Sequence, residues 1–355
     1  MEIFDLMQST NSNEVVFFEE PSVNLRAIIV MNDTVLGPAL ATCRIFDFKN
    51  LEKASKIALQ MAYYNTYRSA LLRRSFGGGS IVLLGDADKV KNEMYLRALG
   101  IFINKLNGKL FLARSSGIGH KDMHEIKRES DYLLGIDERY MKTGNSPVEA
   151  IAKGMIWGLK AAVKEKIGVD SINNLTFAVQ GVGEVGANFV KELLKFDTNI
   201  IVTDTIYDKI KVIQDKVPGI KVVKPKEIYK QKCDVFVSCA FNNIIEEEDI
   251  QQLNCKILTG STNTVLKTEK LEKALAKTDI LYVPGYIING GEIIQLSNEY
   301  AHKDPESVEA ELPEIYDITL KLIQQAKEEN KSINKVAMET AKKYINDVAT
   351  IKKLK

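Results

Sequence analysis

A glycine-rich run in the second half of the chain has the spacing of a phosphate-binding loop. The run is Gly181-Val182-Gly183-Glu184-Val185-Gly186, which follows the apolar stretch Leu175–Gln180 and opens a helical pattern that reaches Leu194. Gly181 allows a tight turn, Gly183 lets the backbone approach a pyrophosphate, and Gly186 lets the helix pack closely on the strand. The N–H groups and the positive dipole end of the helix also favour an anion. The spacing therefore predicts a dinucleotide-binding loop.

The next apolar run, Ile200–Asp204, ends in an acidic residue. Asp204 follows the glycine-rich run at about the distance in sequence at which dinucleotide-binding sites carry an acidic residue. A carboxylate there accepts hydrogen bonds from the adenosine ribose and repels a 2′-phosphate. The sequence therefore predicts NAD as the cofactor, in preference to NADP. A glycine-rich turn that binds no ligand is the alternative interpretation.

The balance of charges excludes several classes of protein. The chain of 355 residues carries 48 lysines and arginines against 47 aspartates and glutamates, a formal net charge of +1. It therefore lacks the positive field of a non-specific nucleic-acid binder, and no polybasic patch indicates a membrane surface. No apolar run reaches the roughly 18 residues of a membrane span, and the start lacks the order of a signal peptide. We expect a cytoplasmic protein that contacts neither nucleic acid nor membrane.

The cysteines and histidines indicate no metal site. The four cysteines form no Cys-x-x-Cys pair, and the three histidines add no zinc spacing. An unpaired cysteine usually behaves as a small buried apolar residue, so buried free thiols are expected. The four are Cys43, Cys233, Cys239 and Cys255.

The apolar pattern predicts strands and helices in both halves of the chain. The runs predicted as strands are Val15–Glu20, Leu25–Met31, Ala39–Phe46, Ser80–Leu84, Lys109–Ala113, Leu175–Gln180, Ile200–Asp204, Val235–Cys239, Ile257–Gly260 and Ile280–Val283. The main stretches of helical pattern are Asn50–Arg74, Lys89–Asn107, Pro147–Gly168 and Pro313–Ile351, the last of which is expected to pack on the first domain.

The same pattern divides the chain into two domains. Strands of the second half are continuously apolar, as in a parallel sheet covered on both faces. Ser146, Pro147 and Glu149 form a helix-start signal just after the boundary. We predict an α/β fold with an N-terminal α/β substrate and oligomerisation domain, residues 1–140 plus C-terminal helices at about 330–355, and a Rossmann-type doubly wound NAD-binding domain, residues 141–330.

Ordered motifs extend over nearly the whole chain. In the first half they are Asn32–Leu40, Thr66-Tyr67-Arg68, Gly77-Gly78-Gly79 and Arg97-Ala98-Leu99-Gly100. In the second half they are Gln180–Gly186, Val202-Thr203-Asp204, Gly260-Ser261-Thr262-Asn263 and Tyr286–Gly291. Together they resemble the leucine dehydrogenases of the Glu/Leu/Phe/Val dehydrogenase family. The resemblance implies that the first domain binds an amino acid, that the second binds NAD, and that the chain forms a homo-oligomer.

The resemblance also implies roles for single residues. Cys239, Ala240, Asn263 and Asn289 join the glycine-rich run and Asp204 in the cofactor site. The implied substrate site, for a small molecule with a carboxylate, contains Leu40, Arg68, Ala113, Arg114, Asn263 and Gln295. Glu292 and Gln295 in its side-chain pocket argue against a purely aliphatic ligand.

The chain departs from the family where acid–base chemistry is expected. Arg68, Ser80 and Ser115 stand where the family carries two lysines and an aspartate. By resemblance, the first lysine holds the substrate carboxylate, the second activates the attacking water, and the aspartate moves the proton. Two further departures are Ala41-Thr42 in place of a Gly-Gly pair and Glu149 or Ile151 in place of a threonine.

These replacements have a direct chemical consequence. A serine without a neighbouring histidine or lysine cannot exchange protons near neutral pH, and the loss of each group lowers a rate by about 10²–10⁴-fold. Arg68 still suits a carboxylate, because a guanidinium binds it through two hydrogen bonds. Arg114, next to the position of the lost acid, is expected to add to anion recognition. Ordinary leucine dehydrogenase activity is therefore expected to be absent or very weak.

Three functions remain open. The first is an NAD-dependent oxidoreductase with changed chemistry, such as the reduction of a preformed imine or ketone. The second is a catalytically inactive homologue that binds NAD or a carboxylate and serves as a regulatory or assembly partner. The third is a non-redox enzyme that uses NAD as an internal hydride relay. We favour the first, because the glycines, Asp204, Asn263 and Asn289 all match the family.

Overall fold

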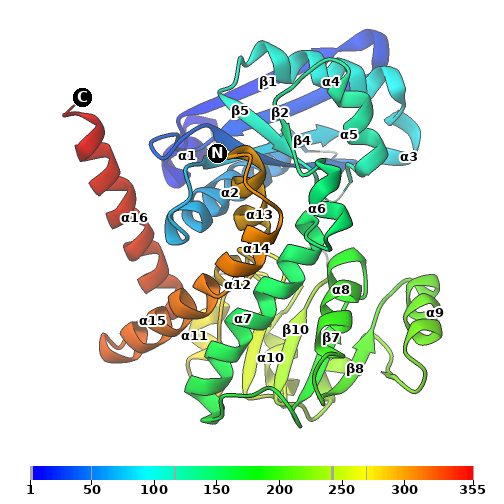
Figure 1. Ribbon diagram of the computed structural model, residues 1–355, viewed down its shortest axis with the longest axis vertical. Helices are drawn as coiled ribbons and strands as arrows, with labels where there is room; N and C mark the ends of the chain where they lie inside the picture. Colours follow the sequence, from blue (N-terminus) through cyan, green and yellow to red (C-terminus); the bar gives the residue numbers. More distant parts are fainter. Residues whose placement is uncertain (1–2, 49, 116, 241–243, 269, 355) are drawn as a thin grey trace. The chain divides into compact units, whose positions relative to one another are not determined.

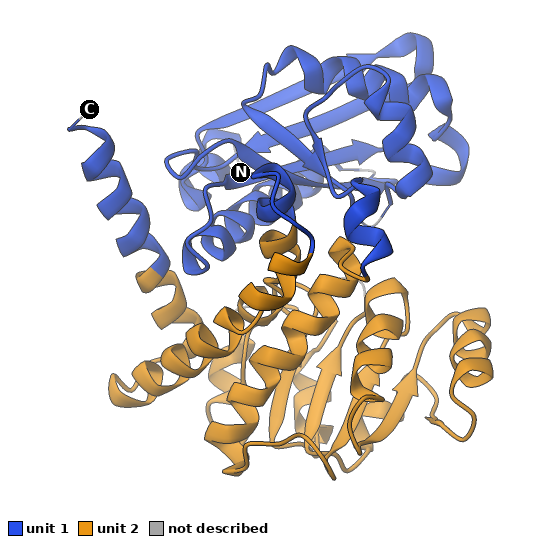
Figure 2. Ribbon diagram, in the orientation of Figure 1, with its two compact units in different colours: residues 1–143, 296–305, 341–355 blue, residues 144–295, 306–340 orange. Residues whose placement is uncertain are grey.

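The structure is a computed structural model that describes residues 3–48, 50–115, 117–240, 244–268 and 270–354 (Figure 1). The chain forms two compact units (Figure 2). The first comprises residues 1–143, 296–305 and 341–355, and the second comprises residues 144–295 and 306–340. No helix within the described ranges is long and apolar enough to cross a membrane.

A six-stranded mixed sheet forms the first unit, in the order β1-β2-β4-β3-β5-β6. Its strands are β1 (Glu14–Glu20), β2 (Leu25–Met31), β3 (Ala39–Phe46), β4 (Gly77–Leu84), β5 (Leu110–Ala113) and β6 (Leu133–Leu134). The pairs β1–β2 and β2–β4 are antiparallel, and the other three pairs are parallel. The helices of this unit are α1 (Ile3–Thr10), α2 (Leu51–Leu71), α3 (Ala87–Val90), α4 (Glu93–Lys105), α5 (His120–Lys127) and α6 (Glu138–Lys142).

Apolar side chains cover both faces of this sheet. Neighbouring residues of a strand point to opposite faces. Ile29 of β2 accordingly packs in one buried cluster with Tyr95 of α4, and Val30 packs in another with Ala58 of α2. Helix α2 therefore packs directly on the sheet.

The close approach of α2 depends on the triple glycine. Strand β4 begins at Gly77, so the glycines belong to the strand, whereas the sequence predicts a strand only from Ser80. A Cβ on Gly78 would lie 2.1 Å from the carbonyl O of Ala62 on α2. Strand propensity is low for glycine, which is why the sequence pattern excludes these residues. The predicted helix Lys89–Asn107 is likewise divided, because Asn92 caps α4 by accepting a hydrogen bond from the N–H of Tyr95.

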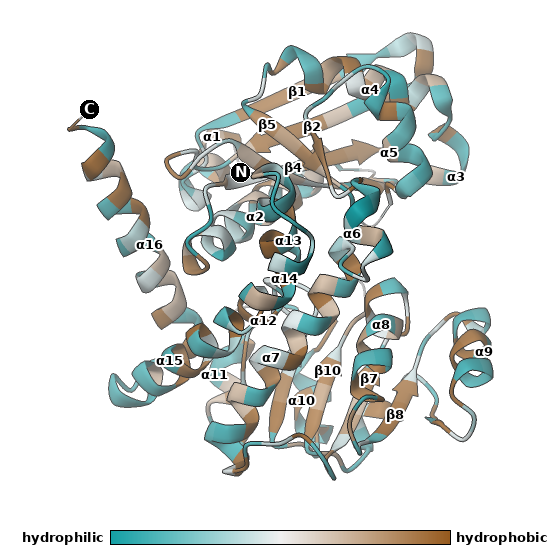
Figure 3. Cartoon of the chain, in the orientation of Figure 1, coloured by the Kyte–Doolittle hydropathy of each residue, from teal (hydrophilic) through white to brown (hydrophobic). Residues whose placement is uncertain are grey.

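A six-stranded parallel sheet forms the second unit, in the order β12-β11-β10-β7-β8-β9. Its strands are β7 (Thr176–Gln180), β8 (Asn199–Thr203), β9 (Lys221–Val222), β10 (Val235–Ser238), β11 (Ile257–Gly260) and β12 (Leu281–Tyr282). This is the strand order of doubly wound dinucleotide-binding folds, with the winding reversed between β7 and β10. The predicted two-domain α/β fold is confirmed. Figure 3 shows β7, β8 and β10 as largely apolar, as a sheet covered on both faces requires.

Helices surround this parallel sheet. They are α7 (Pro147–Ile167), α8 (Glu184–Leu193), α9 (Tyr207–Lys216), α10 (Glu247–Gln252), α11 (Leu271–Leu275), α12 (Gly285–Ile288), α14 (Glu306–Glu311) and α15 (Glu314–Glu328). Two more helices, α13 (Gly291–Tyr300) and α16 (Ile333–Lys352), contribute residues to both units.

The C-terminal helical stretch differs from its prediction. It consists of α15 and α16, which are separated where Asn330 adopts a φ of +51°. Helix α15 packs against α7 in the second unit, where the absence of a side chain on Gly154 makes room for Ile315. Of the predicted C-terminal segment, only residues 341–355 belong to the first unit.

Residues 296–305 join the first unit although the predicted domain ranges place them in the second. The carboxylate of Glu299 accepts hydrogen bonds from the backbone N–H groups of Gly135 and Ile136. The ring of Tyr300 packs against those of Phe76 and Phe111. These contacts join residues more than a hundred positions apart, and no local pattern signals them.

Candidate functional site

The glycine-rich run lies between β7 and α8 of the second unit. Gly181 has a φ of +91°, which favours glycine. A Cβ on Gly181 would lie 2.8 Å from the backbone N of Ala240, and a Cβ on Gly186 would lie 2.0 Å from the carbonyl O of Gly181. Both positions therefore require glycine, the first for the turn and the second for the packing of α8 on the loop.

Gly183 is the open position of this loop. It is the N-cap of α8. Apart from its chain neighbours and its helix, the described residues place no heavy atom nearer to a Cβ at Gly183 than the Nζ of Lys209, at 3.8 Å. Open space at the positive end of a helix is what a pyrophosphate needs. Lys209 of α9 adds a cation there, and sequence reasoning missed it because no spacing rule marks it.

Asp204 follows β8 and joins it to the phosphate loop. Its Oδ2 accepts a hydrogen bond from the N–H of Val182 at 2.9 Å, and its Oδ1 accepts one from the N–H of Ile206 at 2.9 Å. The carboxylate is half-buried. An ionised carboxylate has about four lone-pair sites, so two backbone bonds leave room for a ribose hydroxyl.

Cys239 and Ala240 follow β10, the strand beside β7. The N–H of Cys239 donates to the carbonyl O of Gln180 at 2.7 Å, and the backbone of Ala240 borders Gly181. Both residues thus lie where the winding of the sheet reverses, which is where open α/β sheets bind ligands. Burial raises the pKa of the Cys239 thiol to about 12, so this thiol stays protonated at neutral pH.

Asn289, at the end of α12, carries a buried acceptor that the described residues leave unused. Its Nδ2 donates to the carbonyl O of Ser261 at 2.8 Å, whereas its Oδ1 is buried without a partner among them. Such an atom costs on the order of 1–3 kcal/mol unless a ligand bonds to it. The half-buried Asn263 lies nearby in the same unit, since its carbonyl O accepts from the N–H of Tyr286. A carboxamide donor, such as a nicotinamide carries, fits this unused acceptor.

Ser80 and Ser115, which stand at the expected acid–base positions, belong to the first unit. Strand register places Ser80 of β4 beside Thr42 of β3, and Thr42 beside Ala113 of β5. The Ser80 side chain is fully buried, and its hydroxyl donates to the carbonyl O of Ala58 at 2.7 Å. The hydroxyl proton is therefore directed at the main chain of α2.

Ser115 is tied to the main chain in the same way. Its Oγ donates to the carbonyl O of Cys43 at 2.8 Å and accepts from the N–H of Cys43 at 2.7 Å. The hydroxyl thereby continues the pairing between β5 and β3 beyond the last paired peptide groups. Both of its hydrogen-bonding roles serve the fold.

The other residues that the resemblance assigns to the substrate belong to one unit or the other. Arg68 of α2 is only 6% exposed, and a guanidinium buried to this degree favours an anionic partner. Leu40, Arg68, Ala113 and Arg114 belong to the first unit, and Asn263, Glu292 and Gln295 belong to the second. Among them Leu40, Ala113, Glu292 and Gln295 are buried, and Arg114 is half-buried.

Asn65 is a polar residue of this region that sequence reasoning missed. It is 5% exposed, and its Nδ2 donates to the carbonyl O of Gly79 at 2.9 Å and to the Oγ1 of Thr42 at 3.3 Å. It therefore fixes α2 to β4 and β3 beside Ser80. Its place one turn of helix before Arg68 was the available signal.

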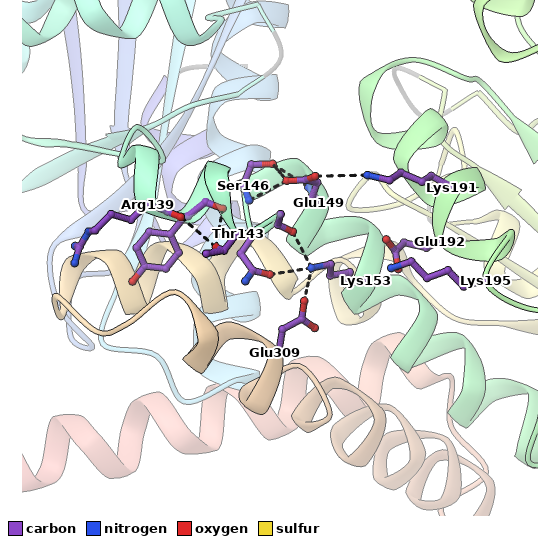
Figure 4. A network of polar contacts seen from close by, with 12 residues as sticks. Arg139, Thr143, Ser146, Glu149, Lys153, Lys191, Glu192, Lys195 and Glu309 are labelled. Atoms are coloured by element: carbon purple, nitrogen blue, oxygen red, sulfur yellow. Dashed lines mark hydrogen bonds and ion pairs between the residues drawn. The ribbon is translucent and has the colours of Figure 1, made fainter. Parts of the chain in front are cut away.

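The start of α7 holds a network of polar contacts (Figure 4). Ser146 and Glu149 form the predicted capping box, and Lys191 lies 3.9 Å from Glu149. The Nζ of Lys153 donates to the carbonyl O of Gly144 at 2.7 Å, to the Oδ1 of Asn145 at 2.9 Å, and to Glu309. Glu149, which with Ile151 is one of the two positions expected to replace a threonine of the family, thus serves the helix start.

The described cysteines are all free. Cys43 and Cys233 are buried, as expected, whereas Cys239 and Cys255 are half-buried. Within the described part of the chain, no group of three or more histidine, cysteine, aspartate and glutamate side chains is arranged to hold a metal ion.

Comparison with known protein families matches almost the whole chain. Residues 14–135 match the Glu/Leu/Phe/Val dehydrogenase dimerisation domain, and residues 135–352 match the Glutamate/Leucine/Phenylalanine/Valine dehydrogenase domain. The phenylalanine dehydrogenase of Bacillus thermotolerans is 36% identical over 331 residues, which are 92% of this chain and 86% of that enzyme. The leucine dehydrogenase of Geobacillus stearothermophilus is 36% identical over 330 residues, 93% of this chain and 89% of that enzyme.

Solved structures show the same likeness. The L-tryptophan dehydrogenase of Nostoc punctiforme superposes with a TM-score of 0.79 at 32% identity, covering 97% of this chain and 99% of that one. The hetero-hexameric glutamate dehydrogenase of Thermus thermophilus has a TM-score of 0.80 at 15% identity, covers 98% of this chain and 95% of that one, and shows the fold alone. The relatives at similar identity are named for three different amino acids, so similarity at this level leaves the side-chain preference open.

Proposed function

Because the chain belongs to the Glu/Leu/Phe/Val dehydrogenase family of oxidoreductases, we propose that it is an NAD-dependent oxidoreductase that does not use the family's lysine-activated water. Its substrate is an amino-acid-like imine or keto compound with a carboxylate. The front segment matches the family's dimerisation domain, which supports a homo-oligomer.

The phosphate loop is the observation that carries the proposal. Gly181 and Gly186 occupy places that no other residue fits, Gly183 leaves space at the start of α8, and Asp204 holds the loop through the N–H of Val182. A protein with no use for a dinucleotide has no need for this geometry. The family uses NAD or NADP, and the carboxylate of Asp204 supports NAD because it would repel a 2′-phosphate.

The first unit supports a change of chemistry. The hydroxyls of Ser80 and Ser115 donate their protons to the main chain at Ala58 and Cys43, so neither proton is available to a water or to a substrate. Arg68 retains a buried cation for a substrate carboxylate. The nicotinamide, when bound, supplies or accepts hydride. A preformed iminium carbon takes up hydride without the addition of water, and therefore requires neither of the missing groups.

The experiment compares candidate substrates by the rate at which the protein consumes NADH in the presence of each. We expect NADH to bind, and a cyclic imine carboxylate such as 1-pyrroline-2-carboxylate to be reduced faster than 2-oxo acids supplied with ammonium. An Arg68→Met variant should raise KM for the imine without changing NADH affinity. Faster reductive amination of 2-oxo acids would contradict the proposal, and so would the absence of NADH binding.

The second candidate is a catalytically inactive binding or assembly partner. The same serine contacts favour it, because the protons of both hydroxyls are bonded to the main chain and stabilise the fold. NADH binding without consumption of any imine or keto acid would support this candidate instead.

A further inference from the structure

The first unit contains a cavity of about 330 Å³ that involves none of the residues assigned above to cofactor or substrate. The end of α1, the loop after β2, and helices α2 and α16 surround it, and all of its lining residues belong to the first unit. Its volume is at the lower end of the range of about 300–1,000 Å³ for small-molecule sites, which indicates a small ligand. We call it the α1–α2–α16 cavity.

Hydrogen bonds hold the base of this cavity in place. The Nδ2 of Asn32 donates to the carbonyl O of Thr10 at 2.7 Å and to the Oγ of Ser12 at 2.8 Å. The Oγ1 of Thr66 donates to the Oδ1 of Asn32 at 2.7 Å. Asn32 and Thr66 are each 2% exposed. The base is therefore polar but already satisfied, and ligand contacts must come from other lining groups.

Two opposite charges line the cavity. One Asp33 oxygen accepts a hydrogen bond from the N–H of Val35 at 2.7 Å, which leaves the other oxygen for a ligand. Lys342 lines the cavity from α16, whereas Asp33 lies in the loop after β2. Within the described part of the chain, neither Asp33 nor Lys342 takes part in an ion pair. A cavity with an unpaired anion and an unpaired cation is complementary to a molecule that carries both charges.

The tyrosines of α2 complete the lining. Burial, a hydrogen bond with Tyr63 and the charge of Asp33 together raise the pKa of Tyr67 far above its usual value. Its hydroxyl therefore stays protonated and can act as a hydrogen-bond donor. Asp33 and Tyr67 both line this cavity.

From these contacts we propose that the α1–α2–α16 cavity binds a free α-amino acid, with its ammonium at Asp33 and its carboxylate at Lys342. This site is separate from the one proposed for the substrate, and its occupancy does not depend on the chain's redox activity.

The walls of the cavity are joined to the segments that carry Ser80 and Arg68. The N–H of Gly78 donates to the carbonyl O of Asp33 at 3.2 Å, and the N–H of Asn32 donates to the carbonyl O of Gly78 at 2.8 Å. Tyr67 directly precedes Arg68 on α2. A ligand that draws Asp33 toward it would therefore act on β4 and α2, so the bound amino acid would be an effector.

Isothermal titration calorimetry of the full-length protein tests the proposal. The probes are glycine, L-alanine, L-leucine, L-glutamine and L-phenylalanine, with acetate and methylammonium as compounds that carry only one of the two charges. We expect at least one amino acid to bind, and neither single-charge compound to compete with it. Asp33→Asn, which keeps the acceptor for Val35, and Lys342→Met should each weaken binding by about 10-fold or more, equivalent to about 1.4 kcal/mol.

Two controls separate this site from the substrate site. Lys343→Met removes an exposed charge from the same helix but does not line the cavity, so it should leave the affinity unchanged. Arg68→Met should also leave binding at the cavity intact. Circular dichroism checks that each variant folds. If Asp33→Asn does not fold, the affinity of Lys342→Met for the amino acid decides the test. The proposal is overturned if no amino acid binds, or if Arg68→Met abolishes binding while Lys342→Met does not.

Discussion

Asp204 and Lys209 place opposite charges beside one phosphate loop. The carboxylate bonds to the N–H of Val182, and the ammonium lies near Gly183. A bound pyrophosphate would be attracted by the ammonium group of Lys209, and a ribose hydroxyl would donate a hydrogen bond to the carboxylate of Asp204. We therefore expect the two side chains to have different roles: the lysine would strengthen binding of any dinucleotide, and the aspartate would select between NADH and NADPH.

Replacing each of these side chains in turn should separate the affinity for a dinucleotide from the selectivity for NADH over NADPH. Asp204→Ala should reduce the preference for NADH over NADPH. Lys209→Gln should weaken the binding of NADH and of NADPH alike by about 3- to 10-fold, which corresponds to a loss of about 1 kcal/mol in binding free energy. Fluorescence titration measures both affinities. Lys211→Gln, which changes a neighbouring exposed lysine of α9, is the control and should have no effect. An unchanged NADH-to-NADPH ratio in Asp204→Ala would refute its role in selection.

Ser80 and Ser115 should respond to replacement as a pair. We expect the wild-type protein to deaminate L-leucine, L-valine and L-phenylalanine at least about 10³ times more slowly than an intact family member. Ser80→Lys with Ser115→Asp should raise the rate more than either change alone, because water activation and proton return act as one unit. Adding Arg68→Lys to these two changes should raise the deamination rate further, since an error of about 1 Å in the position of the substrate lowers the rate by on the order of 100-fold.

NADH absorbance measures these rates, with Ser80→Ala and Ser115→Ala as controls that add no acid or base. Brisk turnover by the wild type would contradict the loss of the acid–base groups. Because Ser80 is fully buried under α2, the lysine variant must also be shown to fold by circular dichroism.

The connection from β7 to α8 shows how two glycines of one loop serve different purposes. Gly186 is enclosed by the backbone of Gly181, whereas Gly183 faces open space. Gly186 is required for folding, and we expect the open space at Gly183 to serve a bound dinucleotide.

This difference predicts opposite phenotypes for the same change. Gly186→Ala should lower stability by about 1–3 kcal/mol, the usual cost of overpacking, because its Cβ would collide with the carbonyl O of Gly181. Gly183→Ala should leave Tm nearly unchanged but weaken NADH binding, because its methyl group intrudes on the pyrophosphate. Thermal unfolding and NADH titration of both variants measure these effects. Equal loss of stability in both would argue against the distinction.

Helix α7 begins in the second unit with a buried cation as well as a capping box. The side chain of Lys153 is 14% exposed and holds Gly144, Asn145 and Glu309 together. Lys153→Met should lower the free energy of unfolding by about 1–3 kcal/mol, because it removes the donor that these three residues share. Lys191→Met is the matched control: its side chain is 66% exposed and 3.9 Å from Glu149, so its loss should cost under about 0.5 kcal/mol. Urea unfolding compares the two, and equal losses would contradict the argument.

The molecule as a whole consists of two units with separate sheets and cores, of which the second carries the phosphate loop. A ligand stabilises the folded state that binds it by mass action. NADH at about 100 times its Kd should therefore raise the free energy of unfolding by about 2.7 kcal/mol. NADPH at the same concentration should raise it less. Differential scanning fluorimetry measures both shifts, and a larger shift with NADPH would contradict the cofactor assignment.

The sequence by itself determined the α/β class, the parallel second sheet and the glycine-rich loop. These depend on local chemistry: apolar periodicity distinguishes strands from helices, and glycines at set spacings mark a turn and a close approach. The helix start at Ser146 and Glu149 could be predicted for the same reason, since both partners of the capping box lie within one turn.

Only the tertiary structure decided what the side chains of Ser80 and Ser115 contact. The Ser80 hydroxyl bonds to Ala58, 22 residues away, and the Ser115 hydroxyl bonds to Cys43, 72 residues away. The position of the Lys209 ammonium near Gly183 likewise depends on where α9 lies in the folded second unit. Hydrogen bonds and close contacts of this kind depend on distances in space that no sequence spacing records, because loops of many lengths can bring the same two residues together.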